Sequence, residues 1–340
     1  MQSTFAMAQD RKRPTLDAAV HQYEHLYVAA GGRGAVAHPL DAGLAAKLYY
    51  DFVTDFYRFA WGDSFHFAAR KRGESFRASL KRSEQGLSDR MALKPGMAVL
   101  DVGCGVGGPL CEIAAHSGAG ITGITNNAYL VAKGNRKIAK LGIAARCRIV
   151  LADFMEGPVG DATFDAAYAI ESTAHTAEKV RVFREIRRVL KPGAVFGGYE
   201  WCLTDRYDAG DPDHRRLKSA LEVGAALPDI ATTGEVVAAL KAAGFEVLDA
   251  RDGAGDSDPE TPWYRSLQGR DMTLGSLPRT PLGRSVTKFV TRAGEAARLL
   301  PAGTRQVSDL LNRAADGLVE AGLRGIFSPL VFFLARKPAN

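Results

Sequence analysis

The alternation of short apolar runs with helical patterns between residues 97 and 201 constrains the fold most. Five segments are typical of strands: "MAVLDVG", "AGITGIT", "CRIVLAD", "FDAAYAIE" and "AVFGGYEW". Helical patterns such as "LVAKGNRKIAKLG" and "VRVFREIRRVLKPG" lie between them. Strands that are apolar along most of their length indicate a parallel sheet covered by helices on both faces. The sequence therefore predicts an α/β fold with a Rossmann-like, doubly wound sheet.

The segments on either side of this core are mostly helical in pattern. We expect a flexible tail over residues 1–14, an N-terminal helical cap over 15–95 and the sheet-containing core over 96–252. Residues 253–327 are predicted to form a helical insertion, which acts as a lid over the carboxyl edge of the sheet. The last core strand, antiparallel to the others, and a short tail are expected within 328–340.

Composition excludes several classes of protein. The chain has 340 residues, of which 46% are hydrophobic and 24% charged, as in folded globular proteins. No apolar run reaches the length of a membrane span, and the first residues lack the apolar segment of a secretory signal. We therefore expect neither a transmembrane helix nor secretion.

The cysteines and the net charge exclude further kinds of site and partner. Cys104, Cys111, Cys147 and Cys202 are too few and too far apart for a disulfide framework, and none forms a CxxC pair. A reducing, cytoplasmic location without a metal centre fits this pattern. The net charge of +6 is modest, and no concentrated basic stripe suggests nucleic acid as a partner.

A glycine-rich loop follows the first core strand. "VLDVGCGVGG" places Gly103, Gly105 and Gly108 between a strand and a helix, where a side chain would block the approach of a ligand to the backbone. This pattern alone does not separate nicotinamide, flavin and S-adenosylmethionine sites. A nicotinamide site needs a carboxylate about 20 residues later, and no acid occurs from Gly118 to Lys133. A dehydrogenase is therefore disfavoured.

The stretch "YYDFVTDFYRFAWGDSFHF" from Tyr49 to Phe67 is almost half aromatic. If its first part is one helix, the rings occupy two adjacent faces, and core packing requires only one. Such rings suit a dry site in which a carbocation forms, because aromatic faces stabilise positive charge without acting as nucleophiles. A buried carboxylate or imidazole would then remove a proton.

Asp101 before the glycine loop, Asp153 in "LADF" and the "LKPG" segment together resemble class I S-adenosylmethionine-dependent methyltransferases. In that family the loop contacts the methionine part of the cofactor, the second strand ends at the ribose, and the acid after the third strand receives the adenine amino group. The resemblance implies S-adenosylmethionine as cofactor, S-adenosylhomocysteine as product and no metal. The implied cofactor-binding residues are Asp101, Gly103, Cys104, Gly105, Gly107, Gly108, Thr125, Asn126, Asp153 and Phe154. The alternative is that Asp101 and Asp153 serve only as helix caps.

Over residues 46–338 the chain also resembles the sterol 24-methyltransferases. The blocks that carry this resemblance are "YYDFVTDFY", "WGDSFHF", "GESF", "LDVGCGVGGP", "YAIEST", "YEWCLTDRYD", "PWY" and "SPLVFFLARKP". The family methylates the side-chain double bond of a sterol, after which a hydride shift and proton loss follow. The implied substrate-binding residues are Tyr57, Trp61, Phe65, His66 and Tyr168, and the implied catalytic residues are Glu171, His175, Tyr57, His66, Asp55 and Glu200.

Departures from that family leave alternatives open. Arg58, Ala60, Leu130 and the segment "AHTA" differ from the usual residues, so another isoprenoid such as a linear triterpene remains a possible acceptor. The proton acceptor stays open among Glu171, His175 and Glu200. Small oxygen or nitrogen acceptors, and a non-catalytic sterol carrier, are the rival functions. The segment "AIESTAHTA" lacks the Pro-Pro-aromatic motif of enzymes that methylate bases in nucleic acids.

Substrate chemistry leads to one further expectation. Because sterols reside in bilayers, we expect peripheral membrane contact through apolar lid surface and basic residues such as Arg70, Lys71 and Arg72, with a homo-oligomer also possible.

Overall fold

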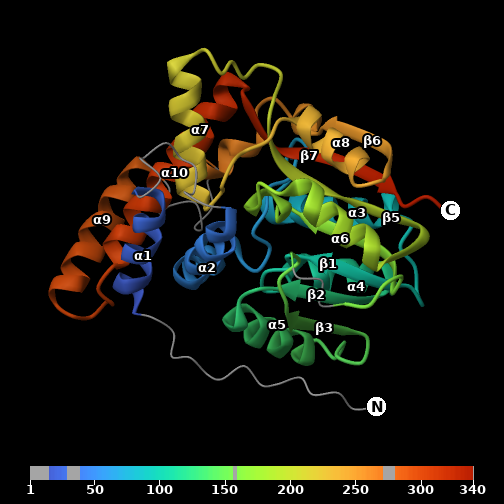
Figure 1. The fold of residues 1–340 in the computed structure, drawn as a ribbon. Helices are drawn as coiled ribbons and strands as arrows, with labels where there is room; N and C mark the ends of the chain where they lie inside the picture. Colours follow the sequence, from blue (N-terminus) through green and yellow to red (C-terminus); the bar gives the residue numbers. More distant parts are fainter. Residues whose placement is uncertain (1–14, 29–38, 156–158, 271–279, 340) are drawn as a thin grey trace.

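A computed structural model describes residues 15–28, 39–155, 159–270 and 280–339 (Figure 1). Its centre is a seven-stranded sheet with the strand order β3-β2-β1-β4-β5-β7-β6. β7 runs antiparallel to β5 and β6, and the remaining pairs are parallel. The predicted doubly wound sheet with an antiparallel last strand is confirmed. The strands are β1 (Ala98–Val102), β2 (Gly120–Thr125), β3 (Cys147–Leu151), β4 (Phe164–Ile170), β5 (Leu190–Leu203), β6 (Glu246–Asp252) and β7 (Phe327–Arg336).

Helices cover both faces of this sheet. One apolar cluster joins strands to α3 (Phe76–Arg90), α4 (Gly108–Ser117) and α5 (Ala128–Lys140), and another joins them to α6 (Lys179–Val189) and α8 (Thr233–Ala242). Central strands such as β1 and β4 are therefore buried on both sides. This double burial explains why their sequences are apolar at successive positions.

The remaining helices gather at one end of the sheet (Figure 1). α10 packs against α7, α9 and α1, and α1 also packs against α2. These helices and the short 3-10 turns are α1 (Leu16–Val28), α2 (Pro39–Trp61), η1 (Thr173–His175), α7 (Pro212–Ala225), η2 (Ala254–Asp256), η3 (Trp263–Gln268), α9 (Pro281–Ala296) and α10 (Thr304–Arg324). The predicted tail over residues 1–14 lies outside the described residues. In the part of the chain that the structure describes, no helix combines the length and apolarity needed to span a membrane.

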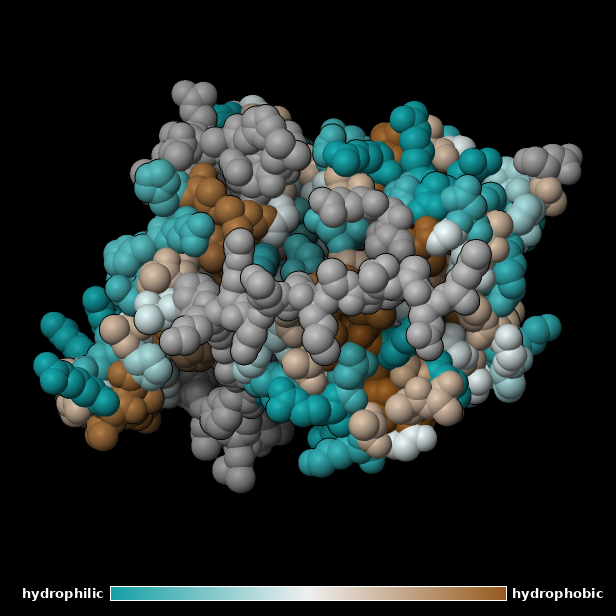
Figure 2. All heavy atoms as spheres, turned by 60° about the horizontal axis from the view of Figure 1, so that its bottom comes forward, coloured by the Kyte–Doolittle hydropathy of each residue, from teal (hydrophilic) through white to brown (hydrophobic). Residues whose placement is uncertain are grey.

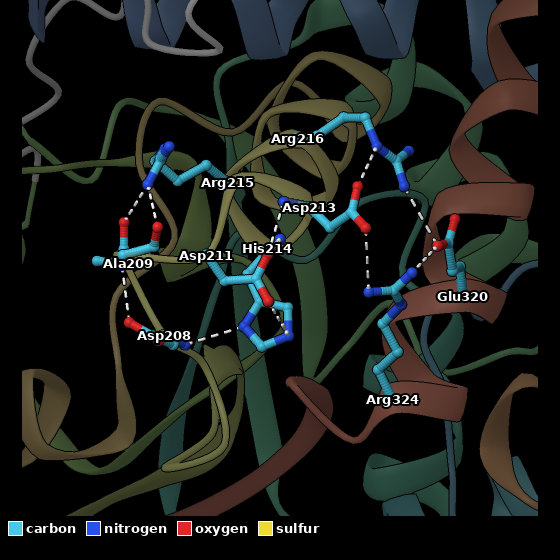
Figure 3. A network of polar contacts seen from close by, with 10 residues as sticks. Asp208, Ala209, Asp211, Asp213, His214, Arg215, Arg216, Glu320 and Arg324 are labelled. Atoms are coloured by element: carbon cyan, nitrogen blue, oxygen red, sulfur yellow. Dashed lines mark hydrogen bonds and ion pairs between the residues drawn. The ribbon is translucent and has the colours of Figure 1, made fainter.

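Small residues let α7 and α10 approach closely. A Cβ at Gly224 on α7 would lie 2.6 Å from the Cβ of Ala314 on α10. Charged side chains extend the contact at the surface, where Arg216 binds Glu320, and Arg324 binds both Glu320 and Asp213 (Figure 3). Exposed ion pairs contribute only about 0–1 kcal/mol each. Apolar packing of α7 on α10 is therefore the main attachment.

Two contacts attach α2 and the following loop to the core. The side-chain amide of Asn127, the N-cap of α5, donates to Asp51 Oδ1 over 2.9 Å. The loop after α2 lies directly on the glycine-rich loop, since a Cβ at Gly108 would be 2.1 Å from the carbonyl oxygen of Asp63. The aromatic stretch is thereby held beside the carboxyl ends of the strands.

Candidate active site

A cavity of about 260 Å³ lies where the parallel strands β1 to β4 end. Such a position, outside the carboxyl ends of the strands, is where doubly wound folds bind ligands. Eight of the ten predicted cofactor residues line it: Asp101, Gly103, Cys104, Gly105, Thr125, Asn126, Asp153 and Phe154. Gly107 and Gly108 do not. Gly107 is the left-handed N-cap of α4, and Gly108 allows the close approach of the Asp63 carbonyl.

The backbone of the glycine loop forms the floor of this cavity. Gly103 has φ of 76°, and a Cβ there would lie 2.4 Å from Ser172 Cβ. Gly105 has φ of 55°, and a Cβ there would meet no atom within 4 Å although the residue lines the cavity. A side chain at Gly105 would occupy space that a ligand can use. This cradle fits a cofactor that packs against the backbone of the loop.

Two carboxylates face the same cavity. Asp101 is 3% exposed and accepts a hydrogen bond from the Tyr168 hydroxyl over 2.9 Å. Burial raises the pKa of Asp101 to about 7, against the opposing effect of that hydrogen bond. Asp153 is oriented by the backbone N–H of Met155, which donates to its Oδ1 over 2.8 Å. Asp101 and Asp153 are therefore fixed on the cavity wall, as a cofactor site with ribose and amino groups would require.

Tyr168 does not lie where a substrate-binding residue would. Its side chain is fully buried, and Tyr168 on β4 is paired in register with Asp101 on β1. Tyr168 lines neither this cavity nor the larger one described next. We predicted substrate contact for this residue, and the structure instead gives it the task of orienting Asp101.

A second, larger cavity of about 510 Å³ adjoins the first. Its volume falls in the range of ligand pockets, roughly 300–1,000 Å³. Five residues line both cavities, namely Tyr50, Phe65, His66, Glu171 and His175. The two cavities therefore meet at these side chains. The aromatic wall of the larger cavity comprises Tyr49, Tyr50, Phe56, Tyr57, Phe65, Phe67 and Trp201.

Glu171 occupies the junction in a strained backbone conformation. Its φ is 56°, a left-handed value that is uncommon for residues other than glycine and that typically marks functional sites. The backbone N–H of Phe67 donates to Oε1 over 2.7 Å, and the indole N–H of Trp201 donates to Oε2 over 2.7 Å. Burial nevertheless raises the pKa of Glu171 to about 7. Near neutral pH this carboxyl can exist in both protonation states.

His175 is held as a neutral imidazole. Its Nδ1 lies 3.0 Å from the carbonyl oxygen of Ala226, so Nδ1 carries the proton and donates. Its Nε2 then accepts from the Tyr50 hydroxyl over 3.2 Å. Burial lowers the pKa of His175 below its ordinary value. The Tyr50 hydroxyl and His175 thus form a second polar pair at the junction.

His66 is held in the opposite charge state. Its Nδ1 lies 2.8 Å from the Phe67 carbonyl oxygen and its Nε2 lies 3.0 Å from Glu84 Oε1. Burial alone lowers the pKa of His66, but the hydrogen bond and charge of Glu84 raise it above its ordinary value. Because both partners accept, both ring nitrogens carry protons in this arrangement. His66 is therefore unsuited to take up a further proton.

The other predicted catalytic residues, together with Trp61 from the predicted substrate-binding set, divide into three cases. Glu200 is fully buried, accepts from the Thr173 hydroxyl and from the backbone N–H of Trp201 over 2.9 Å, and lies 3.7 Å from Lys179 Nζ. It lines neither cavity, and Lys179 is its ion-pair partner. Tyr57 lines the larger cavity, with its hydroxyl bonded to that of Tyr49 and a pKa that burial raises to about 12. The side chains of Asp55 and Trp61 lie outside the described part of the chain.

Sequence reasoning missed part of the larger cavity. Tyr50 and Phe67 lie in the aromatic stretch, and Trp201 lies in the quoted "YEW" segment, so density of rings was a usable signal for them. The α9 and α10 residues had no comparable signal, because an amphipathic pattern does not tell a core helix from a cavity wall. They include Thr287, Ser308, Leu311, Asn312, Ala315 and Leu318.

Comparisons with known proteins agree with this geometry. The family described as sterol methyltransferase C-terminal matches residues 275–339, and the methyltransferase domain family matches residues 100–197. Among solved structures, the [4+2]-cyclase SpnF is 26% identical with a TM-score of 0.65, covering 88% of this chain and 97% of its own. The cyclopropane synthase MmaA2 from Mycobacterium tuberculosis is 15% identical with a TM-score of 0.69, covering 87% and 98%. The latter likeness shows the fold alone.

Curated relatives are similar over most of their length. Cycloartenol-C-24-methyltransferase 1 of Oryza sativa is 46% identical over 95% of this chain and 93% of its own. Sterol 24-C-methyltransferase of Saccharomyces cerevisiae is 41% identical over 88% of this chain and 80% of its own. Identity of this level across nearly the whole chain shows common membership rather than a shared fold only. The protein therefore belongs to the sterol 24-C-methyltransferase family.

Proposed function

We propose that this protein transfers the methyl group of S-adenosylmethionine to the side-chain double bond of a sterol. The observation that supports this most directly is the meeting of two cavities at Glu171. The smaller cavity has the glycine cradle and carboxylates of a cofactor site, whereas the larger one is walled by rings. An apolar acceptor in the larger cavity would present its reacting carbon to the cofactor at this junction.

When bound, S-adenosylmethionine supplies an electrophilic methyl group on a sulfonium. Transfer to the alkene carbon would break the methyl–sulfur bond and release S-adenosylhomocysteine as a neutral thioether. The neighbouring carbon would then carry the positive charge, which a hydride shift moves along the side chain. Tyr57 and Phe65, whose ring centroids lie 5.5 Å apart, together with Phe67 and Trp201 at 6.1 Å, surround this region. Each ring face contributes about 0.5–2 kcal/mol to a cation, and the apolar wall excludes water that would trap it.

Glu171 is the proposed proton acceptor. It lines both cavities, and a pKa near 7 matches a base that acts at neutral pH. His66 already carries two protons in its hydrogen-bonded arrangement, and Glu200 lies behind Thr173, away from both cavities. His175 is the second candidate, since its Nε2 reaches the junction through the Tyr50 hydroxyl. Loss of the proton from the methylated side chain to Glu171 restores a neutral alkene.

The direct test is incubation with methyl-labelled S-adenosylmethionine and a panel of lipids, followed by mass spectrometry of the lipid extract. The panel contains cycloartenol, other Δ24-sterols, a linear triterpene and small phenols or amines. We expect labelled sterol with one added carbon. Label in the phenols or amines only would support the rival small-acceptor function. Sterol binding without transfer in the presence of bound cofactor would support the carrier.

We propose further that α9 contacts the membrane from which the sterol comes. Its outward apolar side chains are Leu282, Val286, Phe289 and Val290, exposed by 53–76%. The exposed bases Lys288 and Arg292 accompany them. Figure 2 shows apolar atoms at the left edge of the molecule, the side on which α9 lies in Figure 1. Apolar side chains beside basic ones are typical of helices that lie on anionic bilayers.

This placement differs from our sequence-based expectation in one residue. Arg70 is 7% exposed and donates to the Glu74 carbonyl, so its side chain faces the protein, whereas Lys71 and Arg72 are exposed. Flotation with phosphatidylcholine vesicles containing phosphatidylserine tests the proposal. We expect the wild type to float and Phe289→Asp to float several-fold less, with Leu141→Asp at the exposed C-cap of α5 as the matched control. Equal flotation of Phe289→Asp would refute the α9 contact.

A further inference from the structure

The larger cavity has a polar end that the proposed reaction does not use. Thr287 on α9 and Ser308 and Asn312 on α10 line this cavity and do not line the smaller one. The residues shared by both cavities come instead from α2, the following loop and the β4–η1 segment. The polar end is therefore built from different elements than the reacting end.

The orientation of the Asn312 amide follows from its partner. Its Nδ2 donates to the Ser308 carbonyl oxygen over 2.8 Å. Because that carbonyl can only accept, the amide must direct its nitrogen there, which leaves Oδ1 pointing the other way. Among the interactions of the described residues, Oδ1 of Asn312 and the hydroxyls of Ser308 and Thr287 have no hydrogen-bond partner. One acceptor and two hydroxyls on α9 and α10 thus border this cavity.

Charge at this end argues against an anionic ligand group. Arg284 is the only lysine or arginine among the described residues that line the larger cavity. Its guanidinium binds the Asp316 carboxylate and donates to the Leu267 carbonyl oxygen over 3.1 Å. A phosphate or diphosphate group needs several charge-assisted donors. A neutral group that both donates and accepts, such as an alcohol, matches the available atoms.

We propose that Asn312, Ser308 and Thr287 form the recognition site for the ring hydroxyl of the sterol. This inference rests on the proposed function, since it assigns the far end of the same acceptor. A Δ24-sterol carries its alkene at one end and its only hydroxyl at the other. With the alkene at Glu171, the hydroxyl lies towards α9 and α10, donates to Asn312 Oδ1 and accepts from Ser308 or Thr287. A linear triterpene hydrocarbon has no group that could satisfy these atoms, so the site discriminates against it.

A substrate and protein cycle tests this assignment. Cycloartenol and its 3-deoxy analogue are compared on wild type, on Asn312→Leu, which keeps the approximate volume, and on Ser308→Ala. Exposed Arg313→Gln on the same helix is the control. The readouts are kcat, KM and sterol affinity from quenching of tryptophan fluorescence, since Trp201 lines the cavity. Affinity reports on the site even in a variant that does not turn over.

In wild type we expect cycloartenol to bind at least about tenfold more tightly than the 3-deoxy analogue. The analogue lacks the hydroxyl, so it forms no hydrogen bond there and leaves the polar atoms of the cavity unpaired. Asn312→Leu should bind cycloartenol about tenfold more weakly than wild type, with KM raised by about the same factor and kcat near the wild-type value. It should bind the 3-deoxy analogue at least as tightly as wild type does. The discrimination then collapses in this variant and is preserved in Arg313→Gln.

Equal discrimination in wild type and Asn312→Leu would overturn the assignment, as would equal losses on both sterols, which indicate a purely structural role. Failure of the proposed function looks different: wild type would then transfer no label to any sterol, whatever its binding preference.

Discussion

Replacing Glu171 by glutamine tests the central step of the proposed reaction. Burial raises the pKa of this carboxyl from 4.5 to about 7. Since each tenfold change in an ionisation constant corresponds to about 1.4 kcal/mol, the site favours the neutral form by roughly 3 kcal/mol relative to water. The same preference makes the carboxylate a stronger base. Glutamine keeps the size and can still accept from Phe67 or Trp201, but it cannot take up a proton.

We expect Glu171→Gln to lower kcat by about 10²–10⁴, the usual contribution of a general base. With S-adenosylmethionine at saturation, kcat of the wild type should rise with pH up to about 7 and then level, because only the ionised carboxylate accepts the proton. That acidic limb should be absent from the residual activity of the variant. Calorimetric affinity for S-adenosylmethionine should change far less than turnover.

A buried carboxyl outside both cavities provides the control. Glu222 on α7 is 3% exposed, binds Lys218 and accepts from the Ile230 N–H over 3.1 Å. Glu222→Gln should keep the acidic limb and most of the turnover. If Glu171→Gln retains kcat within tenfold of wild type together with the limb near pH 7, Glu171 is not the base.

Three other perturbations follow from the geometry. Asp101→Asn should weaken S-adenosylmethionine binding about 10- to 100-fold by calorimetry with little change in Tm, since a charged acceptor is lost; unchanged affinity would separate Asp101 from the cofactor. Gly103→Ala should destabilise by about 2 kcal/mol or more in urea unfolding, because its Cβ meets Ser172 at 2.4 Å with φ of 76°; wild-type stability would contradict this reasoning. The raised pKa of His66 means that its pair with Glu84 stabilises fully below pH 6.5, with the benefit lost as pH rises through the folded-state pKa. The stability advantage of wild type over His66→Gln should therefore shrink from pH 6 to 9, and a constant difference would show that His66 is neutral.

Much of the fold could be predicted from local sequence. Strand and helix order and the glycine loop follow from periodicity and from residues that only certain backbone conformations tolerate, whereas periodicity does not fix the direction of the last strand. One boundary differed: the expected helix through "VRVFREIRRVLKPG" ends at Val189, and the segment "LKPG" belongs to β5. Local preference is weakest at such ends, where the sheet decides which residues pair.

The site was predictable only as a set of candidates. Glu171 and Glu200 were both candidates, each an acid at or near the end of a core strand, and the position of Glu171 after the fourth strand favoured it. Strand direction and neighbours separate them, because one faces the junction of two cavities and the other faces Thr173 and Lys179. Tyr168 was assigned to the substrate from resemblance, and register places it under Asp101.

The sequence by itself thus determined the architecture, the cofactor loop and the concentration of rings, since these depend on neighbouring residues. Only the tertiary structure decided which acid lies at the junction of the two cavities, which histidine is charged and which helices line the larger cavity. The burial, the neighbouring charges and the hydrogen bonds of each of these groups depend on residues that lie far apart in the chain. Asn312 lies 141 positions after Glu171, yet both line one cavity.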